Sequence, residues 1–203
     1  EALASPELTT LYETISSRTD LMHENWQLAL DYLEDFAARH LELQVEIAEI
    51  PAPYFNEKAR AEFMLRRFQE LGLQVSIDHV GNVLAHRPGS KGNNEQILIA
   101  AHLDAAFPDT TEFKVRRRGN KLYGPSIVDN SLGLMAMLAL VEALNYADVK
   151  TKNSLLFVAT VGEEGLGDLR GVKALLANVE LFSATKGFIA LDSQGHENIV
   201  HKS

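Results

Sequence analysis

The sequence predicts an α/β domain built on a largely parallel sheet, and two observations carry this prediction. Short apolar segments at 96–101, 154–160 and 187–191 have the length and composition of buried strands. Segments with helical spacing of apolar residues lie between them, and strands that alternate with helices are typical of parallel sheets. In such sheets the functional side chains gather where the strands end.

The composition narrows the class of function. The chain has 203 residues and a formal net charge of -9, so we expect no nucleic-acid partner. It has no cysteine, so any metal must be held by histidine and carboxylate side chains, and this composition fits a cytoplasmic protein. No apolar run approaches the roughly 20 residues of a membrane span, so we expect no membrane partner.

Residues 1–50 are predicted to be helical. Apolar side chains such as Ala29 and Leu33 recur near helical spacing there, with acidic residues between them. Pro51 ends this segment because proline lacks an N–H and disfavours helix in the residue before it. We therefore expect residues 1–50 to pack as a helical segment on a domain formed by 51–203.

The next elements are a helix and a pair of strands. Asn56 is predicted to cap a helix over 57–71. The stretches 74–78 and 82–86 are predicted to form a hairpin-like pair joined near Gly81.

The second half of the chain is predicted to build the centre of the domain. After the strand at 96–101, the residues of 131–144 are apolar on nearly every side, which is typical of a buried helix. The strand at 154–160, a helix at 169–176 and the strand at 187–191 follow, and residues 199–203 are compatible with a further strand. The basic triplet 116–118 is interpreted as a solvated strand or loop.

Ligand-type side chains follow the predicted strands. They are His102 and Asp104 after 96–101, Glu163 and Glu164 after 154–160, and Asp192 after 187–191, with Asp129 just before the apolar helix. A Glu-Glu pair alone is most often a solvated acidic turn. At the end of a buried strand, however, the two carboxylates repel each other and lose hydration, so a cation is expected beside them.

The residue types suit a divalent cation such as Zn²⁺, which takes imidazole nitrogen and carboxylate oxygen. In the His-x-Asp pair, alternate residues of an extended chain point to opposite faces. Asp104 is therefore expected to orient His102 by a hydrogen bond rather than to bind the metal itself. Asp129 could bridge two cations, and one residue of the Glu pair could act as a general base.

Four segments together resemble the co-catalytic dizinc exopeptidases and deacylases. They are Ala-Ala-His-Leu-Asp at 100–104, the stretch from Leu122 to Gly133, Thr-Val-Gly-Glu-Glu-Gly at 160–165, and Ala-Leu-Asp at 190–192. This family includes peptidase T, aminoacylase, acetylornithine deacetylase and the glutamate carboxypeptidases. The likeness covers roughly residues 50–203 and is greatest to the peptidase T side.

The resemblance implies a three-layer fold like that of the zinc exopeptidases, with a mixed, mostly parallel sheet flanked by helices. It implies a first zinc held by His102, Asp129 and Asp192 and a second held by Asp129 and Glu164. Zinc is the expected metal, with cobalt or manganese as substitutes.

The resemblance also assigns roles around the metals. Glu163 would be the general base and Asp104 would orient His102. The family carries a non-proline cis peptide after the bridging aspartate, which here would be Asp129–Asn130.

The family's length bears on what this chain does alone. Members are about twice as long and insert a lid or dimerisation domain after the equivalent of Asp192. The chain then returns and supplies a late histidine ligand and groups that grip the substrate. His196 and His201 lie too near Asp192 to match that histidine. The 203 residues are therefore expected to be the N-terminal part of a truncated catalytic domain, with an incomplete second site and little or no activity.

The leading functional hypothesis is an exopeptidase that uses metal ions to hydrolyse amide bonds in small peptides. This activity is expected of the full-length parent protein, which would be a homodimer in the cytoplasm. An N-acyl amino acid deacylase and the neighbouring aminopeptidase families are alternatives in the same class. A non-catalytic relative that binds only metal or ligand is an alternative in another class. The remaining alternative is an α/β domain whose acidic strand ends bind nothing.

Overall fold

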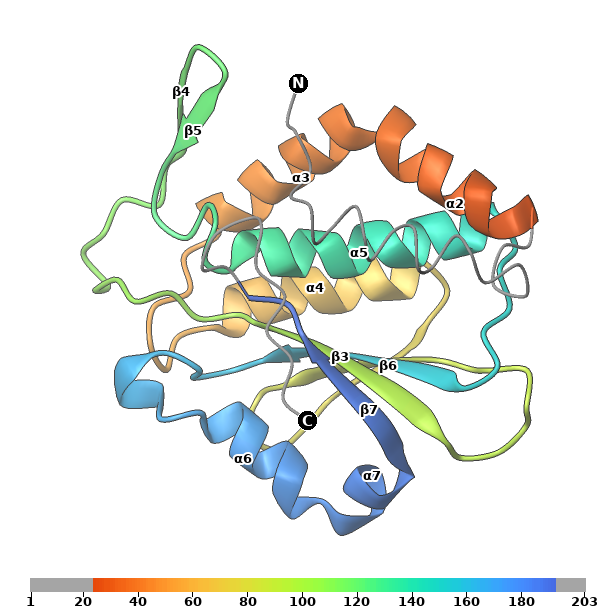
Figure 1. The fold of residues 1–203 in the computed structure, drawn as a ribbon. Coiled ribbons are helices and arrows are strands. Elements are labelled where there is room, and N and C mark those ends of the chain that lie inside the picture. The colour runs from red at the N-terminus through yellow and green to blue at the C-terminus, as the bar shows by residue number, and fades with distance from the viewer. Residues whose placement is uncertain (1–23, 193–203) are drawn as a thin grey trace, which may run out of the picture.

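The structure is a computed structural model that describes residues 24–192 (Figure 1). The predictions of helix over residues 1–23 and of a strand at 199–203, together with the interpretation of His196 and His201, lie outside the described residues.

The described residues form an α/β fold with a five-stranded sheet of order β1-β2-β6-β3-β7. The strands are β1 (Gln74–Ile77), β2 (Val83–Arg87), β3 (Gln96–His102), β6 (Ser154–Thr160) and β7 (Thr185–Ala190). Strand β3 pairs in parallel with β6 and β7, whereas β2 pairs antiparallel with β1 and β6. The sheet is therefore mixed, and its parallel part contains the three segments first predicted as strands.

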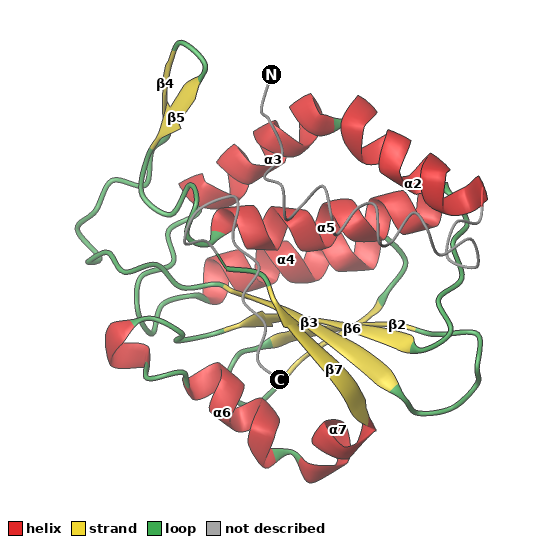
Figure 2. Cartoon of the chain, viewed as in Figure 1, coloured by secondary structure: helices red, strands yellow, loops and turns green. Residues whose placement is uncertain are grey.

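Helices cover both faces of the sheet, which gives the expected three layers (Figure 2). On one face lie α4 (Lys58–Glu70) and α5 (Ser131–Tyr146), and α2 (Glu24–Asp35) and α3 (Ala37–Glu49) pack on α5, on its side away from the sheet. On the other lie α6 (Arg170–Ala177) and α7 (Val179–Ala184), after a short 3-10 turn η1 (Gly165–Gly167). The hairpin of β4 (Arg116–Arg118) and β5 (Lys121–Tyr123) projects away from the sheet (Figure 1).

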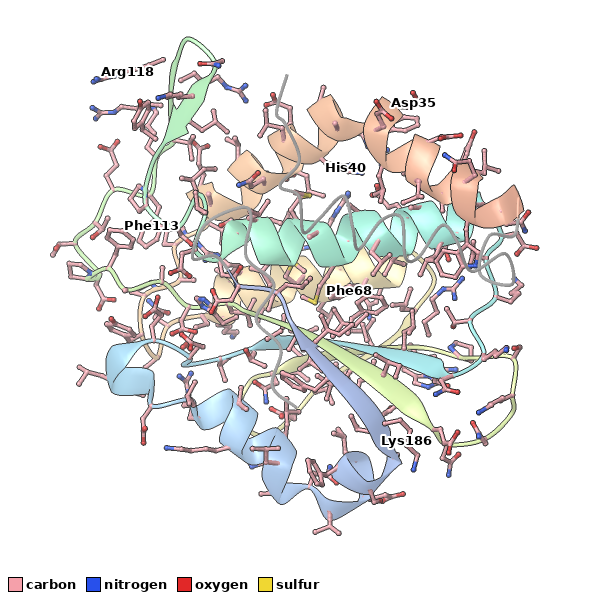
Figure 3. The ribbon with its side chains drawn as sticks, viewed as in Figure 1. Asp35, His40, Phe68, Phe113, Arg118 and Lys186 are labelled. Atoms are coloured by element: carbon pink, nitrogen blue, oxygen red, sulfur yellow. The ribbon has the colours of Figure 1, made fainter. Side chains whose placement is uncertain are left out.

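The core lies between the sheet and the helices α4 and α5. Met137, Leu138 and Val141 of α5 have no exposed surface, because apolar residues occupy almost every side of this helix. Phe68 of α4 packs against Phe157 of β6, with 6.0 Å between the ring centroids (Figure 3). Burial of large apolar side chains contributes about 1.5–3 kcal/mol each and is the main stabilising term in such a core.

The strand register brings the ends of the parallel strands to one edge. His102 lies opposite Thr160. Beyond this pair, the Leu103 N–H donates to the Thr160 carbonyl at 2.7 Å, and the Leu191 N–H donates to the Ala100 carbonyl at 2.7 Å. The segments that leave β3, β6 and β7 therefore start side by side, as expected for the carboxyl edge of a parallel sheet.

Most predicted elements agree with the structure, and the exceptions are local. Asn56 is not the cap of α4: the N-cap is Glu57, whose side chain makes no capping bond and is buried. The helix α7 was not predicted. The apolar pattern of 1–50 is only partly buried: Ala29 is buried, whereas Leu30, the next residue of α2, is exposed.

A buried ionic cluster joins the N-terminal helices to α5. Glu142 of α5 accepts a hydrogen bond from Arg39, and its Oε2 lies 3.1 Å from the Nε2 of His40 and 3.4 Å from the Tyr32 hydroxyl. Figure 3 shows His40 between α3 and α5. One carboxylate in an otherwise apolar helix thus serves donors from both α2 and α3.

Replacing Glu142 by alanine is expected to lower the free energy of unfolding by about 1–3 kcal/mol, because buried donors on His40 and Tyr32 lose their acceptor. Urea denaturation measures this change. The control is Glu62→Ala, which removes an exposed ion pair with Lys58 and should change stability by less than about 1 kcal/mol. Equal effects of the two substitutions would contradict the proposed importance of the buried cluster.

Candidate metal centre

His102 is the last residue of β3 and lies at the centre of the site. Its side chain is only 3% exposed. Its Nε2 lies 2.8 Å from Oδ1 of Asp129 and 3.7 Å from Oδ1 of Asp192, and its Nδ1 lies 3.0 Å from the carbonyl oxygen of Asp104. The backbone therefore fixes the imidazole through Nδ1, and Nε2 points toward the two carboxylates.

Asp104 has no exposed surface and fixes the loop of the Glu pair. Its two carboxylate oxygens accept the backbone N–H groups of Glu163 at 2.9 Å and Glu164 at 2.8 Å. The carboxylate lies 3.6 Å from Nδ1 of His102, so the backbone carbonyl of Asp104 is the nearer partner of the ring. From the sequence, the carboxylate of Asp104 was expected to make the hydrogen bond to the His102 ring.

Asn130 brings Asp129 and Asp192 together. The Asp129–Asn130 peptide bond is cis, as the resemblance implied. The buried Asn130 side chain accepts the N–H of Gly133, which caps α5, and donates at 2.8 Å to the carbonyl of Leu191. The start of α5 and the end of β7 are thereby tied together, one residue from each aspartate.

The structure brings all the predicted ligands to one place. Two groups have one donor atom per residue, all within 4.8 Å of one another: His102 with Asp129 and Asp192, and His102 with Glu163 and Glu164. His102 belongs to both groups. No group among residues 24–192 joins Asp129 to Glu164, so a bridging role for Asp129 stays a prediction.

The site contains more carboxylates than cationic side chains, and their charges shift one another's pKa values. Burial raises the pKa of Glu163 and of Glu164, and the neighbouring carboxylates, Asp129 among them, raise both further. Burial alone would lower the pKa of His102, but hydrogen bonds and the charges of Asp104 and Asp129 raise it to about 10. In the metal-free protein a proton on His102 therefore balances part of the carboxylate charge.

The donor set fits a divalent cation. One imidazole nitrogen and four carboxylates converge, which is a donor set that Zn²⁺, Mn²⁺ and Co²⁺ accept. Burial and the surrounding carboxylates disfavour ionisation of Glu163 and Glu164, and a cation between the groups would favour it. The geometry thus supplies both the ligand atoms and the charge that a cation needs.

Some residues that build the site were not found from the sequence. Asn82, in the turn before β2, accepts the Val161 N–H at 3.0 Å and donates to Asp78 and to the Gly171 carbonyl. It thereby holds the chain that leaves β6. An asparagine near a glycine is typical of any hairpin turn, so the sequence pattern contained no indication of this role.

Arg170 and Glu57 form a second support. Arg170 Nη2 donates to both oxygens of the buried Glu57, at 2.9 and 2.8 Å. The guanidinium lies against Gly162, where an added Cβ would come 1.9 Å from Nη1 and where φ is +57°. A residue other than glycine at 162 would be strained at this φ and would have to displace the Arg170 side chain, so glycine is favoured in the loop that leads to Glu163.

Comparison with known proteins identifies a family for this chain. Residues 98–198, which include His102, Asp129, Glu163, Glu164 and Asp192, match the profile of Peptidase family M20/M25/M40. The chain belongs to this family.

Three relatives illustrate the M20 likeness. A Pyrococcus abyssi protein named for LysW-lysine and LysW-ornithine hydrolysis is 32% identical over 64% of this chain and 34% of its own length. The cytosol non-specific dipeptidase of Escherichia coli is 26% identical over 62% of this chain and 29% of its own. The crystal structure of aminopeptidase PepT from Bacillus cereus superposes with a TM-score of 0.67 at 23% identity, over 78% of this chain and 44% of that one.

The PepT superposition confirms the α/β fold class, with its mixed sheet and flanking helices. The chain spans about a third of the length of the two curated relatives. No helix within residues 24–192 is long and apolar enough to cross a membrane.

Proposed function

We propose that this M20 chain holds two divalent metal ions, zinc by preference, and that the whole protein uses them to hydrolyse amide bonds in small peptides. The observation that carries the proposal is the pair of three-residue donor groups that share His102 and include Glu163. His102, Asp129 and Asp192 would hold one ion, and Glu164 with Asp129 would hold the other. Cobalt and manganese suit the same donors.

The metals and this chain's residues would divide the chemistry. A bound divalent cation polarises a carbonyl oxygen and makes water more acidic. Glu163 is proposed as the general base, since burial and its acidic neighbours raise its pKa and so strengthen its affinity for a proton. Asp104 holds the backbone of Glu163, and the carbonyl of Asp104 orients the ring of His102.

The substrate class is proposed from the relatives. The dipeptidase name of the Escherichia coli relative supports small peptides, and the name of the Pyrococcus protein, a hydrolase of LysW-linked lysine and ornithine, supports a second candidate, an N-acyl amino acid. Because the chain spans only part of those proteins, we assign turnover to the whole protein, as a homodimer in the cytoplasm. For the 203 residues alone we propose weak metal binding and little or no hydrolysis.

A Glu163→Gln exchange in the full-length protein is expected to lower kcat for dipeptide hydrolysis at least about 100-fold, because the amide cannot accept the proton. Zinc affinity, measured by calorimetry, should change little. The control is Glu112→Gln, an exposed carboxylate outside both donor groups. Turnover that survives Glu163→Gln would remove Glu163 as the base, and the absence of turnover in the unmodified protein with every metal would favour a non-catalytic relative.

Parallel assays on dipeptides, tripeptides and N-acyl amino acids separate the exopeptidase from the deacylase. A preference for N-acyl amino acids over free peptides would select the second candidate. Robust hydrolysis by the isolated 203-residue chain would contradict the assignment of turnover to the whole protein.

A further inference from the structure

Arg60 of α4 has no exposed surface. Its Nη1 donates to the Leu103 carbonyl at 2.8 Å and to the Ser126 hydroxyl at 2.9 Å. Its Nε and Nη2 donate to the carbonyl of Ile50, at 3.1 and 2.7 Å. One side chain therefore contacts three segments that are far apart in the sequence.

Two of these acceptors belong to the segments that carry the candidate ligands. Leu103 stands between His102 and Asp104, and Ser126 stands three residues before Asp129. The Leu103 segment leaves β3, whereas the Ser126 segment enters α5 from the β4–β5 hairpin. A single nitrogen of Arg60 thus bonds to both, so a movement of either segment relative to the other would break one of its bonds.

The charge of Arg60 also faces the site. Burial lowers the pKa of the guanidinium to about 10, while the charge of Asp104 opposes this shift. Arg60 therefore stays ionised at neutral pH. A buried guanidinium is costly unless its donors are satisfied, and here every nitrogen has an acceptor on one of the three segments.

We propose that Arg60 is a positioning residue of the metal centre, which fixes the separation of His102 from Asp129 by bonding to both of their segments. Arg60 does not itself contact a ligand atom in either donor group. The proposal rests on the proposed function only in taking these side chains as metal ligands. It assigns to α4 a role in metal geometry that lies outside the ligand set.

The matched control is Arg87 of β2, a second buried arginine. Its Nη2 donates at 2.7 Å to the carbonyl of Val149. Arg87 pairs with Leu155 near the start of β6, whereas His102 pairs with Thr160 at the end of that strand. Arg60→Met and Arg87→Met each leave a carbonyl acceptor without its buried guanidinium donor. Both variants should lose stability, so thermal unfolding does not distinguish a structural from a positioning role.

Titration of the 203-residue chain with Co²⁺ distinguishes the two roles. In Arg60→Met we expect Co²⁺ affinity to fall roughly 10–100-fold, the range typical of residues that orient metal ligands, and the visible absorption bands of the bound cobalt to shift. Arg87→Met should keep the wild-type affinity and spectrum. Arg60→Lys should recover part of the affinity, because one ammonium can bond to Leu103 or Ser126 but not to all three acceptors.

Crystal structures of the metal-free variants provide a readout that does not depend on metal binding. The distance from His102 Nε2 to Asp129 Oδ1 is 2.8 Å here, and it should lengthen in Arg60→Met but not in Arg87→Met. If Arg60→Met does not fold, Ser126→Ala tests the same link, because it removes the Ser126 acceptor, and with it a 3.4 Å contact to the Ser131 hydroxyl, while Arg60 keeps its other acceptors. An unchanged distance in the Arg60 or Ser126 variant would overturn the proposal, even if the wild-type chain binds no Co²⁺ and the proposed function fails.

Discussion

Saturating zinc is expected to raise the melting temperature of the chain, and Glu164→Gln is expected to remove the part of that rise that comes from the site beside Glu164. A ligand at about 100 times its Kd stabilises by about 2.7 kcal/mol, which for a domain of this size corresponds to roughly 5–10 °C. Glu164 belongs to the donor group with His102 and Glu163. An amide oxygen is a weaker ligand than a carboxylate, so the zinc-dependent part of the stability should fall.

The same substitution should have the opposite sign without metal. Burial and the charges of Asp129 and Glu163 raise the pKa of Glu164, which means that its ionised form is disfavoured in the folded state. Metal-free Glu164→Gln should therefore melt at or above the wild-type temperature. The exposed Glu112→Gln should leave both the metal-free and the zinc-bound melting temperatures unchanged. A zinc-dependent rise of wild-type size in Glu164→Gln would contradict the assignment of Glu164 as a ligand.

Asp104→Ala is expected to lower the free energy of unfolding by about 3–5 kcal/mol, the cost typical of removing one member of a buried ionic cluster. The substitution leaves the N–H groups of Glu163 and Glu164 without their acceptor and removes the nearest countercharge of Arg60. Urea denaturation measures the change. The comparison is Asp109→Ala in the loop after β3, where the carboxylate is exposed and a change below about 0.5 kcal/mol is expected.

Asp104→Asn separates the charge of Asp104 from its shape. The amide can accept one of the two N–H groups but presents its own donor to the other, so its loss of stability should fall between those of wild type and Asp104→Ala. If all three Asp104 and Asp109 variants unfold alike, the carboxylate does not hold the Glu-pair loop.

The candidate ligands could be predicted from the sequence because of the register of a parallel sheet. Strand 154–160 was predicted with the bounds that the structure gives, and its partner β3 ends opposite it. Once two such strands are recognised, the residues that follow them must share an edge. His102 and the Glu pair required no further information than this.

The supports of the site could not be predicted, because their roles depend on tertiary contacts. Arg60 precedes Met64 and Phe68 by four and eight residues, so the helical spacing places it on their buried face of α4, but that spacing does not identify the acceptors of a buried guanidinium. Asp104 was predicted to orient His102, but its carboxylate accepts two N–H groups from a loop about 60 residues later. Such long-range partners are set by how the elements pack, which a local pattern does not contain.

The measurement that tests the central claim most directly is anomalous X-ray scattering at the zinc edge, on crystals of the chain grown with zinc. We expect one peak among His102, Asp129 and Asp192, and a second, weaker peak beside Glu164. The contradictory result is a map without a peak at either place while the same side chains still converge as they do here. The acidic strand ends would then be a structural cluster that binds no metal.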